Sequence, residues 1–467
     1  MKITAQILLW GVIIVSSTIS QERKSGREST ERFITEIDTA TIIRQSLTES
    51  PDARKAAYVA RTRDKQYVVL QGKRDKEYEG VGTSGVVFSA DGKRSAYLAR
   101  FGTQYFAVVD GREHERYEAL GTDPSFSPDG KHVAYVAMTD GKQFVVLDGM
   151  ELKHYEGIGS RGPIFSPDGK HLAFLVIEGE KLFVVLDEKE GKRYDAIAMN
   201  TITFNPRSNL LAFVATSAGK TFLVYGGKEQ KKYSVSTGAA PAFSPDGKRL
   251  AFVASDTAGM FIVLDGKHGK HYGQIPGESI KFSRDGRKVA YAAQLGGKWR
   301  MVIDGREGKP YENTGANTFS FSPDGRRFAY VAIAGNSRFV VIDGMEGKRY
   351  DAIPEGNPLF TPDGKRVVYL AQTNDLWRVV TDNIEGKSYK AIQTGTLSIS
   401  PDGKVFSYGA LIEKKISVVV NGIEGNPYDA ILGQGGGKIV FDSATQLHYL
   451  AAKDNKVYLV EEQIRGD

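Results

Sequence analysis

A unit of 39 residues repeats from Ser50 to the C-terminus, and this period constrains the fold more than any other feature of the chain. The turn sequence Ser-Pro-Asp-Gly begins intact copies at Ser127, Ser166, Ser244, Ser322 and Ser400, and degenerate copies begin at Ser50, Ser89, Asn205, Ser283, Thr361 and Asp442. Successive starts are separated by 39, 38 and then seven times by 39 residues, with about 42 before the last copy. Insertions are almost excluded, so the 467 residues indicate one repeat array rather than several unrelated domains.

A tyrosine recurs in register with the turn and forms a second marker of the repeat. Its copies are Tyr78, Tyr117, Tyr155, Tyr194, Tyr233, Tyr272, Tyr311, Tyr350, Tyr389 and Tyr428. We expect each ring to pack against an adjacent strand and each hydroxyl to meet a polar partner, as buried tyrosines usually do. The alternative is an aromatic rim that contacts a ligand.

Residues 125–163 show what one unit is expected to fold into. The turn Pro128-Asp-Gly130 follows a short extended segment, because Pro presets φ and Gly accepts a positive φ. The apolar runs that follow are β-rich and show no helical period. Four short antiparallel strands, here called A to D, are predicted at Ser125–Ser127, Lys131–Ala137, Phe144–Leu147 and Lys153–Tyr155. Four strands in about 40 residues is the size of a propeller blade.

The two ends of the chain are predicted to share the last blade. The last copy, Lys438–Val460, contains strands A to C, and Glu31–Thr39 lies where a D strand would precede the first copy. Pairing of these segments would remove the open sheet edges. The predicted fold class is therefore an all-β propeller of four-stranded antiparallel blades, with ten full repeats and an eleventh closed by the N-terminal strand. One large ring and two smaller rings both stay open.

The N-terminus has the order of a secretory signal peptide. Lys2 precedes the apolar run Ile7–Val15, and small residues follow as far as Ser20. The alternative, an uncleaved anchor, needs about 20 apolar residues. We therefore expect cleavage after Ser20 and export to the periplasm or the medium, with residues 1–20 as signal peptide, residues 21–45 as a segment with the closing strand, and residues 46–467 as the propeller array.

Composition narrows the function classes. The chain has no cysteine, so its core alone holds the fold, and thiolate chemistry is excluded. The net charge of +6 is small for 467 residues, and Lys and Arg are mixed with Asp and Glu in the same turns. Such dilution argues against a nucleic-acid partner.

The pattern Phe-Ser-Pro-Asp-Gly-Lys-x-x-Ala-Tyr resembles the WD-like repeat of TolB-type propellers. It occurs at Phe126–Tyr135, Phe165–Phe174, Phe243–Phe252 and Phe321–Tyr330, and the resemblance covers residues 50–467. It implies the blade fold, which in that family serves periplasmic partner binding, surface proteins and the lid domains of some peptidases. TolB-type proteins also carry an N-terminal α/β domain, whereas only about 25 residues separate Ser20 from the first copy here.

The loops divide into a repetitive set and a varied set. The A–B turns and C–D hairpins are near-copies, which indicates turn geometry rather than recognition. The B–C and D–A loops vary, and varied loops on a rigid scaffold are the usual carriers of binding residues. Neutral drift is the alternative explanation for that variation. The loop residues predicted to bind a ligand or partner are Arg161, Asn200, Glu278, Asn317, Glu355 and Asn357.

Trp299 and Trp377 are the most distinctive single residues of the array. They lie two repeats apart at one repeat position near the start of strand C, where other copies hold Gln66, Gln143 and Arg338. A position that tolerates polar groups is predicted to be partly exposed, so these indoles could stack on a sugar or anchor a protein. Burial between blades is the alternative.

Neither a metal site nor an enzyme motif emerges from the sequence. Each Pro-Asp-Gly turn offers one carboxylate, which is too few for calcium. His268 and His271 are the one close histidine pair, and their hairpin offers no third ligand nearby. No Gly-x-Ser-x-Gly elbow is present. We expect no metal, no cofactor and no catalytic residue.

The sequence thus predicts an exported, non-catalytic and monomeric binding scaffold. Its partner would be a protein or an envelope polysaccharide, bound through the B–C and D–A loops, with no nucleic acid and no membrane-spanning segment. The alternative is a carbohydrate-active enzyme, a glycosidase or lyase, whose paired carboxylates come from distant repeats at the propeller mouth.

Overall fold

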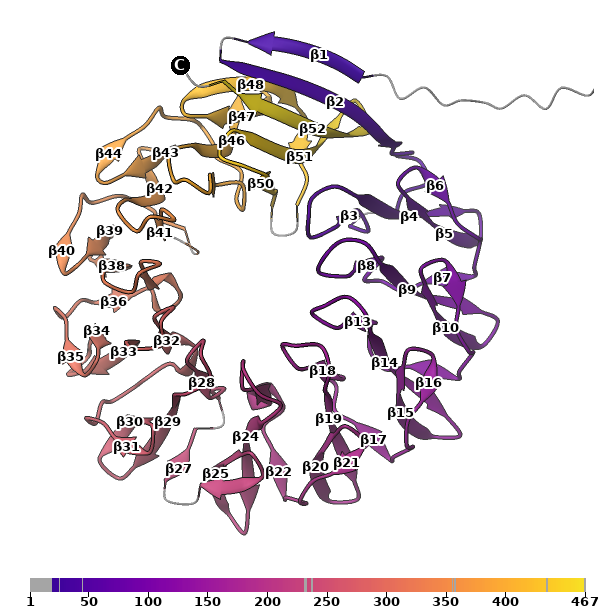
Figure 1. Ribbon diagram of the computed structural model, residues 1–467, viewed down its shortest axis with the longest axis vertical. Coiled ribbons are helices and arrows are strands. Elements are labelled where there is room, and N and C mark those ends of the chain that lie inside the picture. The colour runs from indigo at the N-terminus through magenta and orange to yellow at the C-terminus, as the bar shows by residue number, and fades with distance from the viewer. Residues whose placement is uncertain are drawn as a thin grey trace, which may run out of the picture.

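The computed structural model describes residues 19–24, 26–43, 45–230, 233–236, 238–354, 356, 358–433 and 436–465. Across these residues, eleven antiparallel sheets follow one another in a single ring around a central opening (Figure 1). Counting an interrupted innermost strand as one, ten of the sheets have the four strands expected of a blade, and the sheet that contains both chain ends has five. The predicted all-β propeller with a shared last blade is confirmed.

The B and C strands form the centre of every blade and pair with each other throughout. The B strands are β4 (Ala56–Thr62), β9 (Ser95–Phe101), β14 (Val133–Thr139), β19 (Leu172–Glu178), β24 (Leu211–Ser217), β29 (Leu250–Asp256), β33 (Val289–Leu295), β38 (Phe328–Ala334), β42 (Val367–Thr373), β46 (Phe406–Ile412) and β51 (Gln446–Lys453). The C strands are β5 (Lys65–Leu70), β10 (Gln104–Val109), β15 (Lys142–Leu147), β20 (Lys181–Leu186), β25 (Lys220–Tyr225), β30 (Gly259–Leu264), β34 (Lys298–Ile303), β39 (Ser337–Ile342), β43 (Leu376–Thr381), β47 (Lys415–Val420) and β52 (Lys456–Ile464).

The outer D strands are short. They are β6 (Lys73–Arg74), β11 (Arg112–Glu113), β16 (Met150–Glu151), β21 (Lys189–Glu190), β26 (Lys228–Gln230), β31 (Lys267–His268), β35 (Arg306–Glu307), β40 (Met345–Glu346), β44 (Ile384–Glu385), β48 (Ile423–Tyr428) and, in blade 11, β2 (Arg27–Glu36). In most blades the repeated tyrosine adds one further bridge to strand C, such as Tyr155 with Gln143. The D strand therefore begins earlier than the predicted Lys153.

Strand A is split in most blades. Its pieces are β3 (Thr48–Glu49), β7 (Gly80–Val81) with β8 (Val87–Phe88), β12 (Ala119–Leu120) with β13 (Ser125–Phe126), β17 (Gly157–Ile158) with β18 (Ile164–Phe165), β22 (Ala196–Ile197) with β23 (Thr203–Phe204), β27 (Ser234–Val235) with β28 (Ala242–Phe243), β32 (Lys281–Phe282), β36 (Asn313–Thr314) with β37 (Ser320–Phe321), β41 (Leu359–Phe360), β45 (Ser398–Ile399), and β49 (Ala430–Ile431) with β50 (Ile439–Phe441). In blade 1, Ile42 already pairs with Ala60, before the predicted array start at residue 46.

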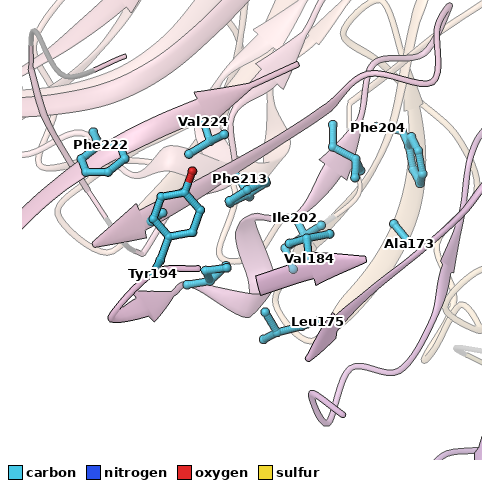
Figure 2. Packing of buried hydrophobic residues seen from close by; sticks show 12 residues of the cluster. Ala173, Leu175, Val184, Tyr194, Ile202, Phe204, Phe213, Phe222 and Val224 are labelled. Atoms are coloured by element: carbon cyan, nitrogen blue, oxygen red, sulfur yellow. The ribbon is translucent and has the colours of Figure 1, made fainter. Parts of the chain in front are cut away.

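The B and C strands are apolar on both faces because each sheet is covered on both sides by a neighbouring sheet. All five residues Val133–Ala137 of β14 are buried. The cores lie between blades: Figure 2 shows Leu175 and Val184 of blade 4 packed with Phe213 and Phe222 of blade 5. This two-sided burial explains why these strands lack the alternation of a solvent-facing sheet.

The Ser-Pro-Asp-Gly turns have one structural role in the described blades. Ser127 Oγ donates to Asp129 Oδ1 at 2.6 Å, and the same Oγ accepts from the backbone N–H of His132 at 2.9 Å. Gly130 has φ of 72°, and a Cβ at this position would come within 3.3 Å of Asp91 in the preceding turn. The turns thus close each blade and pack against one another, which confirms that their sameness reflects geometry.

The tyrosine row also joins blades. Nine of its ten members are buried. Tyr272 donates to Glu307 Oε1 of the next blade at 3.0 Å, and Lys270 Nζ lies 2.6 Å from the same oxygen. Equivalent tyrosine bonds link Tyr155 to Glu190, Tyr311 to Glu346 and Tyr389 to Glu424. The predicted packing of the rings is confirmed for the nine buried members, but among the described residues the Tyr117 and Tyr350 hydroxyls have no hydrogen-bond partner.

Blade 11 is assembled from both ends of the chain. Its sheet order is β1-β2-β52-β51-β49, where β1 (Ile19–Lys24) adds a strand beyond the expected four. The closing strand runs from Arg27 to Glu36, earlier than the predicted Glu31–Thr39. Blade 11 then meets blade 1, because Arg54 contacts Asp442 at 2.9 Å and Glu461 at 3.2 Å.

Residues 1–18, which hold most of the predicted signal peptide, lie outside the described residues. In the part of the chain that the structure describes, no helix is long and apolar enough to cross a bilayer.

Candidate functional site

The loops predicted to connect strands D and A occupy a different place from the expected one. Leu120 pairs with Ala137 and Phe126 with Val133, so residues 121–124 lie beside the middle of β14. Val136 N donates to Thr122 Oγ1 at 3.1 Å. This side-chain bond takes the place of a backbone bond at the point where strand A is interrupted. These loops therefore interrupt the innermost strand instead of joining the B–C hairpins at one end of the blade. The cause is the split of strand A, which the sequence does not reveal.

The predicted loop residues fall into two pairs on consecutive blades. Arg161 is exposed, and its guanidinium donates to the carbonyls of Met199 at 3.3 Å and Ile202 at 2.9 Å in the next blade, beside Asn200. Its bonds tie neighbouring loops together. Asn200 is exposed on the 3-10 helix η1 (Met199–Thr201).

The second pair lies on blades 7 and 8. Glu278 is exposed on η2 (Gly277–Ser279), and Asn317 is exposed on η3 (Ala316–Thr318). These two short helices pack against each other. Glu355 and Asn357 lie outside the described residues. The structure therefore brings Glu278 near Asn317 and Arg161 near Asn200.

Trp299 and Trp377 occupy equivalent positions in β34 and β43, each half-buried against the core between blades. They pair across the hairpin with Gln294 and Gln372. Such indoles combine an anchored ring with an accessible edge. Their binding role stays a prediction.

An arginine follows each tryptophan, and sequence reasoning missed it. Arg300 and Arg378 stand where most other blades bury a phenylalanine, such as Phe144. Their Nη1 atoms donate to Glu307 at 2.8 Å and Glu385 at 2.7 Å. The Trp-Arg dipeptide at a core position was the signal that could have revealed them.

Grooves recur between consecutive blades at the end that carries the A–B turns and C–D hairpins. The groove between blades 7 and 8 has a volume of about 670 Å³, and equivalent grooves between blades 3 and 4, 4 and 5, and 6 and 7 measure about 240, 340 and 300 Å³. The residues that line the largest include Ile303, Tyr311, Phe328 and Tyr330. Sequence reasoning assigned this end to turn geometry alone. The hollows form between blades, so no single repeat encodes them.

The groove lined by Ile303, Tyr311, Phe328 and Tyr330, here called the blade 7–8 groove, also has a basic rim. Its lining includes four cations and two carboxylates, namely Lys288, Arg306, Lys309 and Arg326 with Asp304 and Glu307. Hydrogen bonding from Lys270, helped by Arg300 and Tyr272, lowers the pKa of Glu307 to about 2. The Glu307 carboxylate is therefore ionised and hydrogen-bonded to neighbouring side chains. The remaining cations of the rim suit an anionic, partly apolar ligand.

Every resolved pKa shift of a carboxylate in the described residues is downward. The Ser127 hydroxyl lowers the pKa of Asp129 to about 2, and the Ser89 hydroxyl does the same for Asp91. A glycosidase general acid needs a raised pKa. These carboxylates instead act as hydrogen-bond acceptors in turns and joints.

A third metal-ligating side chain lies beside the histidine pair. Asp256, at the end of β29, joins His268 and His271, and their ligand atoms all lie within 4.8 Å of one another. The expectation that no third ligand lies near this hairpin is therefore wrong. Asp256 belongs to the B strand, and only the sheet register brings it to the hairpin.

The fold and these grooves define an eleven-blade β-propeller with repeated interblade hollows. A scan against known protein-family models and a search of curated proteins each found no match.

Solved structures similar to the chain include TolB from Acinetobacter baumannii, at 16% identity over 65% of this chain and 79% of that one, with a TM-score of 0.25. They also include the β-propeller domain of the Trilobed protease from Pyrococcus furiosus, at 12% identity over 58% and 97% of the chains with a TM-score of 0.27. A structure of the eukaryotic initiation factor matches at 12% identity over 88% and 99%, with a TM-score of 0.40. At these scores the similarities carry no functional argument.

Proposed function

We propose that this protein is an exported, non-catalytic scaffold that binds an anionic polysaccharide of the cell envelope in its interblade grooves. The observation that supports it most is the recurrence of one groove at equivalent positions, four times among the described residues. A site repeated once per blade suits a ligand that is itself a repeating chain. The main groove combines an aromatic and aliphatic lining with charged groups at its rim, which suits a ligand that is both apolar on its faces and charged.

The blade 7–8 groove is the proposed main site. Arg306 and Arg326 stand on opposite sides of it, from consecutive blades. Guanidinium groups bind carboxylates in bidentate geometry, so two of them can clamp an acidic sugar whose ring packs on Phe328. Trp299 belongs to the same pair of blades and supports the joint from its partly buried position.

Export is the second part of the proposal and rests on the N-terminal sequence. Lys2, the apolar run and the small residues before Gln21 have the order of a signal peptide. Cell fractionation of the full chain, with N-terminal sequencing of the exported form, tests it. Retention of residues 1–20 on a protein found inside the cell would contradict it.

The binding test uses polygalacturonate as the acidic probe and dextran as the neutral probe, with affinity measured by calorimetry. We expect the protein to bind polygalacturonate, and we expect Arg306→Glu with Arg326→Glu to weaken binding at least tenfold. The matched control is Lys131→Glu, an exposed cation at the turn position of blade 3 that is equivalent to Arg326. It should leave binding unchanged.

A second double variant, Glu278→Ala with Asn317→Ala, separates the groove from the predicted loop site. Loss of binding in this variant, with full binding in the groove variant, would return the site to the loops. Equal binding of dextran and polygalacturonate would show that the basic rim does not select an anionic polysaccharide. Capture of an envelope protein with neither polysaccharide bound would favour a protein partner.

The same polysaccharide incubation tests the enzyme alternative. A glycosidase would release new reducing ends, and a lyase would release unsaturated sugars. We expect neither product, because the shifted carboxylates of the described residues have lowered pKa values. Steady product release that disappears in a carboxylate variant would contradict the non-catalytic assignment.

A further inference from the structure

Three repeat positions converge at the outer part of a blade: the last residue of strand B, the last residue of the D strand, and the residue three further on. In blade 4 these positions hold Glu178, Glu190 and Arg193. The Arg193 guanidinium lies 3.0 Å from Glu178 and 3.3 Å from Glu190, so the three form an ion cluster. The fold therefore places three side chains within reach of one another at this point.

In blade 6 the same three positions hold metal-ligating residues. They are Asp256, His268 and His271, whose ligand atoms lie within 4.8 Å of one another. His268 replaces the glutamate that stands at this position in blades 2 to 5 and 7 to 10. Blade 6 therefore has an imidazole at a position where eight other blades have a glutamate, and in several of them that glutamate accepts a hydrogen bond from the preceding blade.

Neighbouring groups already orient two of the three side chains. Asp256 Oδ1 accepts from the backbone N–H of Ala258 at 2.8 Å, while its Oδ2 lies 2.9 Å from His271 Nε2. The His268 ring packs on the buried Phe261, with ring centroids 3.9 Å apart. The two imidazole rings have centroids 4.8 Å apart and meet edge to face. Fixed ligands of this kind lower the cost of assembling a metal site.

We propose that Asp256, His268 and His271 form a zinc-binding site on blade 6. Two imidazoles and one carboxylate are a common zinc donor set, and the fourth position stays open to water or to a ligand group. Zinc–nitrogen bonds of about 2.0–2.1 Å at tetrahedral angles place donor atoms about 3.4 Å apart. Asp256 and His268 are exposed and His271 is partly buried, and their ligand atoms, now within 4.8 Å of one another, must close to that spacing when zinc binds.

The site adjoins the groove between blades 6 and 7, because His268 also lines that groove. Asp265 and Lys267 line the same groove. Zinc would give this groove a cation that can bind a carboxylate or hydroxyl group, whereas in blade 4 the Arg193 guanidinium at the equivalent place is already paired with Glu178 and Glu190.

A plain salt bridge is the competing explanation of the cluster. Hydrogen bonding from His271 lowers the pKa of Asp256. Such a bridge needs only His271. The metal site needs His268 as well, and this difference decides the test.

The test is zinc titration of the full chain by calorimetry after treatment with a chelator and dialysis into metal-free buffer. We expect about one zinc ion per chain, with affinity at least tenfold weaker in His268→Ala, His271→Ala and Asp256→Asn. His154→Ala is the matched control, because this exposed histidine of blade 3 occupies the position of His271 without a neighbouring histidine. It should bind zinc like the unaltered protein.

Cobalt substitution provides a second readout that is independent of affinity. Cobalt in a site with two imidazoles should give visible absorption bands that disappear in His268→Ala. Circular dichroism should show that each variant stays folded. Full zinc binding in both histidine variants, or no zinc bound by the unaltered protein at millimolar zinc, would overturn the proposal.

Discussion

Blades 7 and 8 are joined by contacts that recur around the ring, whereas blade 11 is closed by contacts between the two ends of the chain. In the first joint, Tyr311 donates to Glu346 at 3.2 Å, and the exposed Lys309 lies 3.3 Å from the same oxygen. Exposed pairs of this kind contribute little singly. The stability of such a joint comes from the hydrophobic core between the two blades and from the recurrence of the same contacts around the ring.

Among the polar contacts of blade 11, one ion pair is deeply buried. Arg27 of β2 and Glu462 of β52 have 4% and 3% exposure and form a salt bridge. Arg27 also donates to the carbonyls of Val418 at 3.0 Å and Ile423 at 2.8 Å in blade 10. The comparison teaches that many equivalent contacts stabilise the repeated joints together, whereas the stability of the ring closure depends on a few residues that have no equivalent in the other blades.

The largest predicted effect follows from breaking that buried pair. Arg27→Met leaves Glu462 charged and buried, so we expect a loss of about 3–5 kcal/mol in the free energy of unfolding. Urea titration followed by circular dichroism measures it. Adding Glu462→Leu should restore much of the stability, because both charges are then gone. An unchanged unfolding midpoint in Arg27→Met would mean that closure does not limit the stability of the ring.

A smaller effect compares one substitution at both kinds of joint. Tyr428 is fully buried and donates to Glu31 of the closing strand at 2.6 Å. We expect Tyr428→Phe and Tyr311→Phe to cost about 1 kcal/mol each, with the larger loss at Tyr428 because its acceptor lies in the closing strand. Thermal unfolding of the two variants, side by side, measures the difference. A larger loss for Tyr311→Phe would reverse the comparison.

Acid should weaken the repeated joints through their carboxylates. Hydrogen bonds lower the pKa of Asp91, Asp129 and Glu307 to about 2 in the folded protein. A group whose folded pKa is depressed stabilises the fold above its unfolded pKa of about 4 and loses that contribution as pH falls toward 2. We therefore expect the thermal midpoint to fall between about pH 4 and pH 2.

The Asp129→Asn variant checks the origin of that acid sensitivity. It should be less stable at neutral pH, and its thermal midpoint should vary less with pH between about pH 4 and pH 2 than that of the unaltered protein. An identical pH profile in the two proteins would place the acid sensitivity elsewhere.

The smallest effect on stability is expected at the two tryptophans. Other blades hold Gln66 and Gln143 at this position, so Trp299→Gln with Trp377→Gln should change the free energy of unfolding little, within about 1 kcal/mol. Polygalacturonate affinity should weaken if the indoles contribute to the grooves. A large drop in the thermal midpoint would instead make both residues part of the core.

The sequence predicted correctly those features that depend on residues within a single repeat. The Pro-Asp-Gly turn, the buried tyrosine and the apolar B and C strands each follow from local φ preferences, hydroxyl chemistry and two-sided burial. It failed where residues meet across strands or blades. The split of strand A, the Arg300–Glu307 contact and Asp256 beside His271 depend on sheet register.

The sequence by itself determined the blade, the number of repeats and the sharing of the last blade between the chain ends, because a 39-residue period leaves one compact four-stranded unit per copy. Only the tertiary structure decided the single ring, the place of the varied loops along strand A, and the grooves between blades. These features are set by how neighbouring sheets pack, and packing joins residues that lie a whole repeat apart.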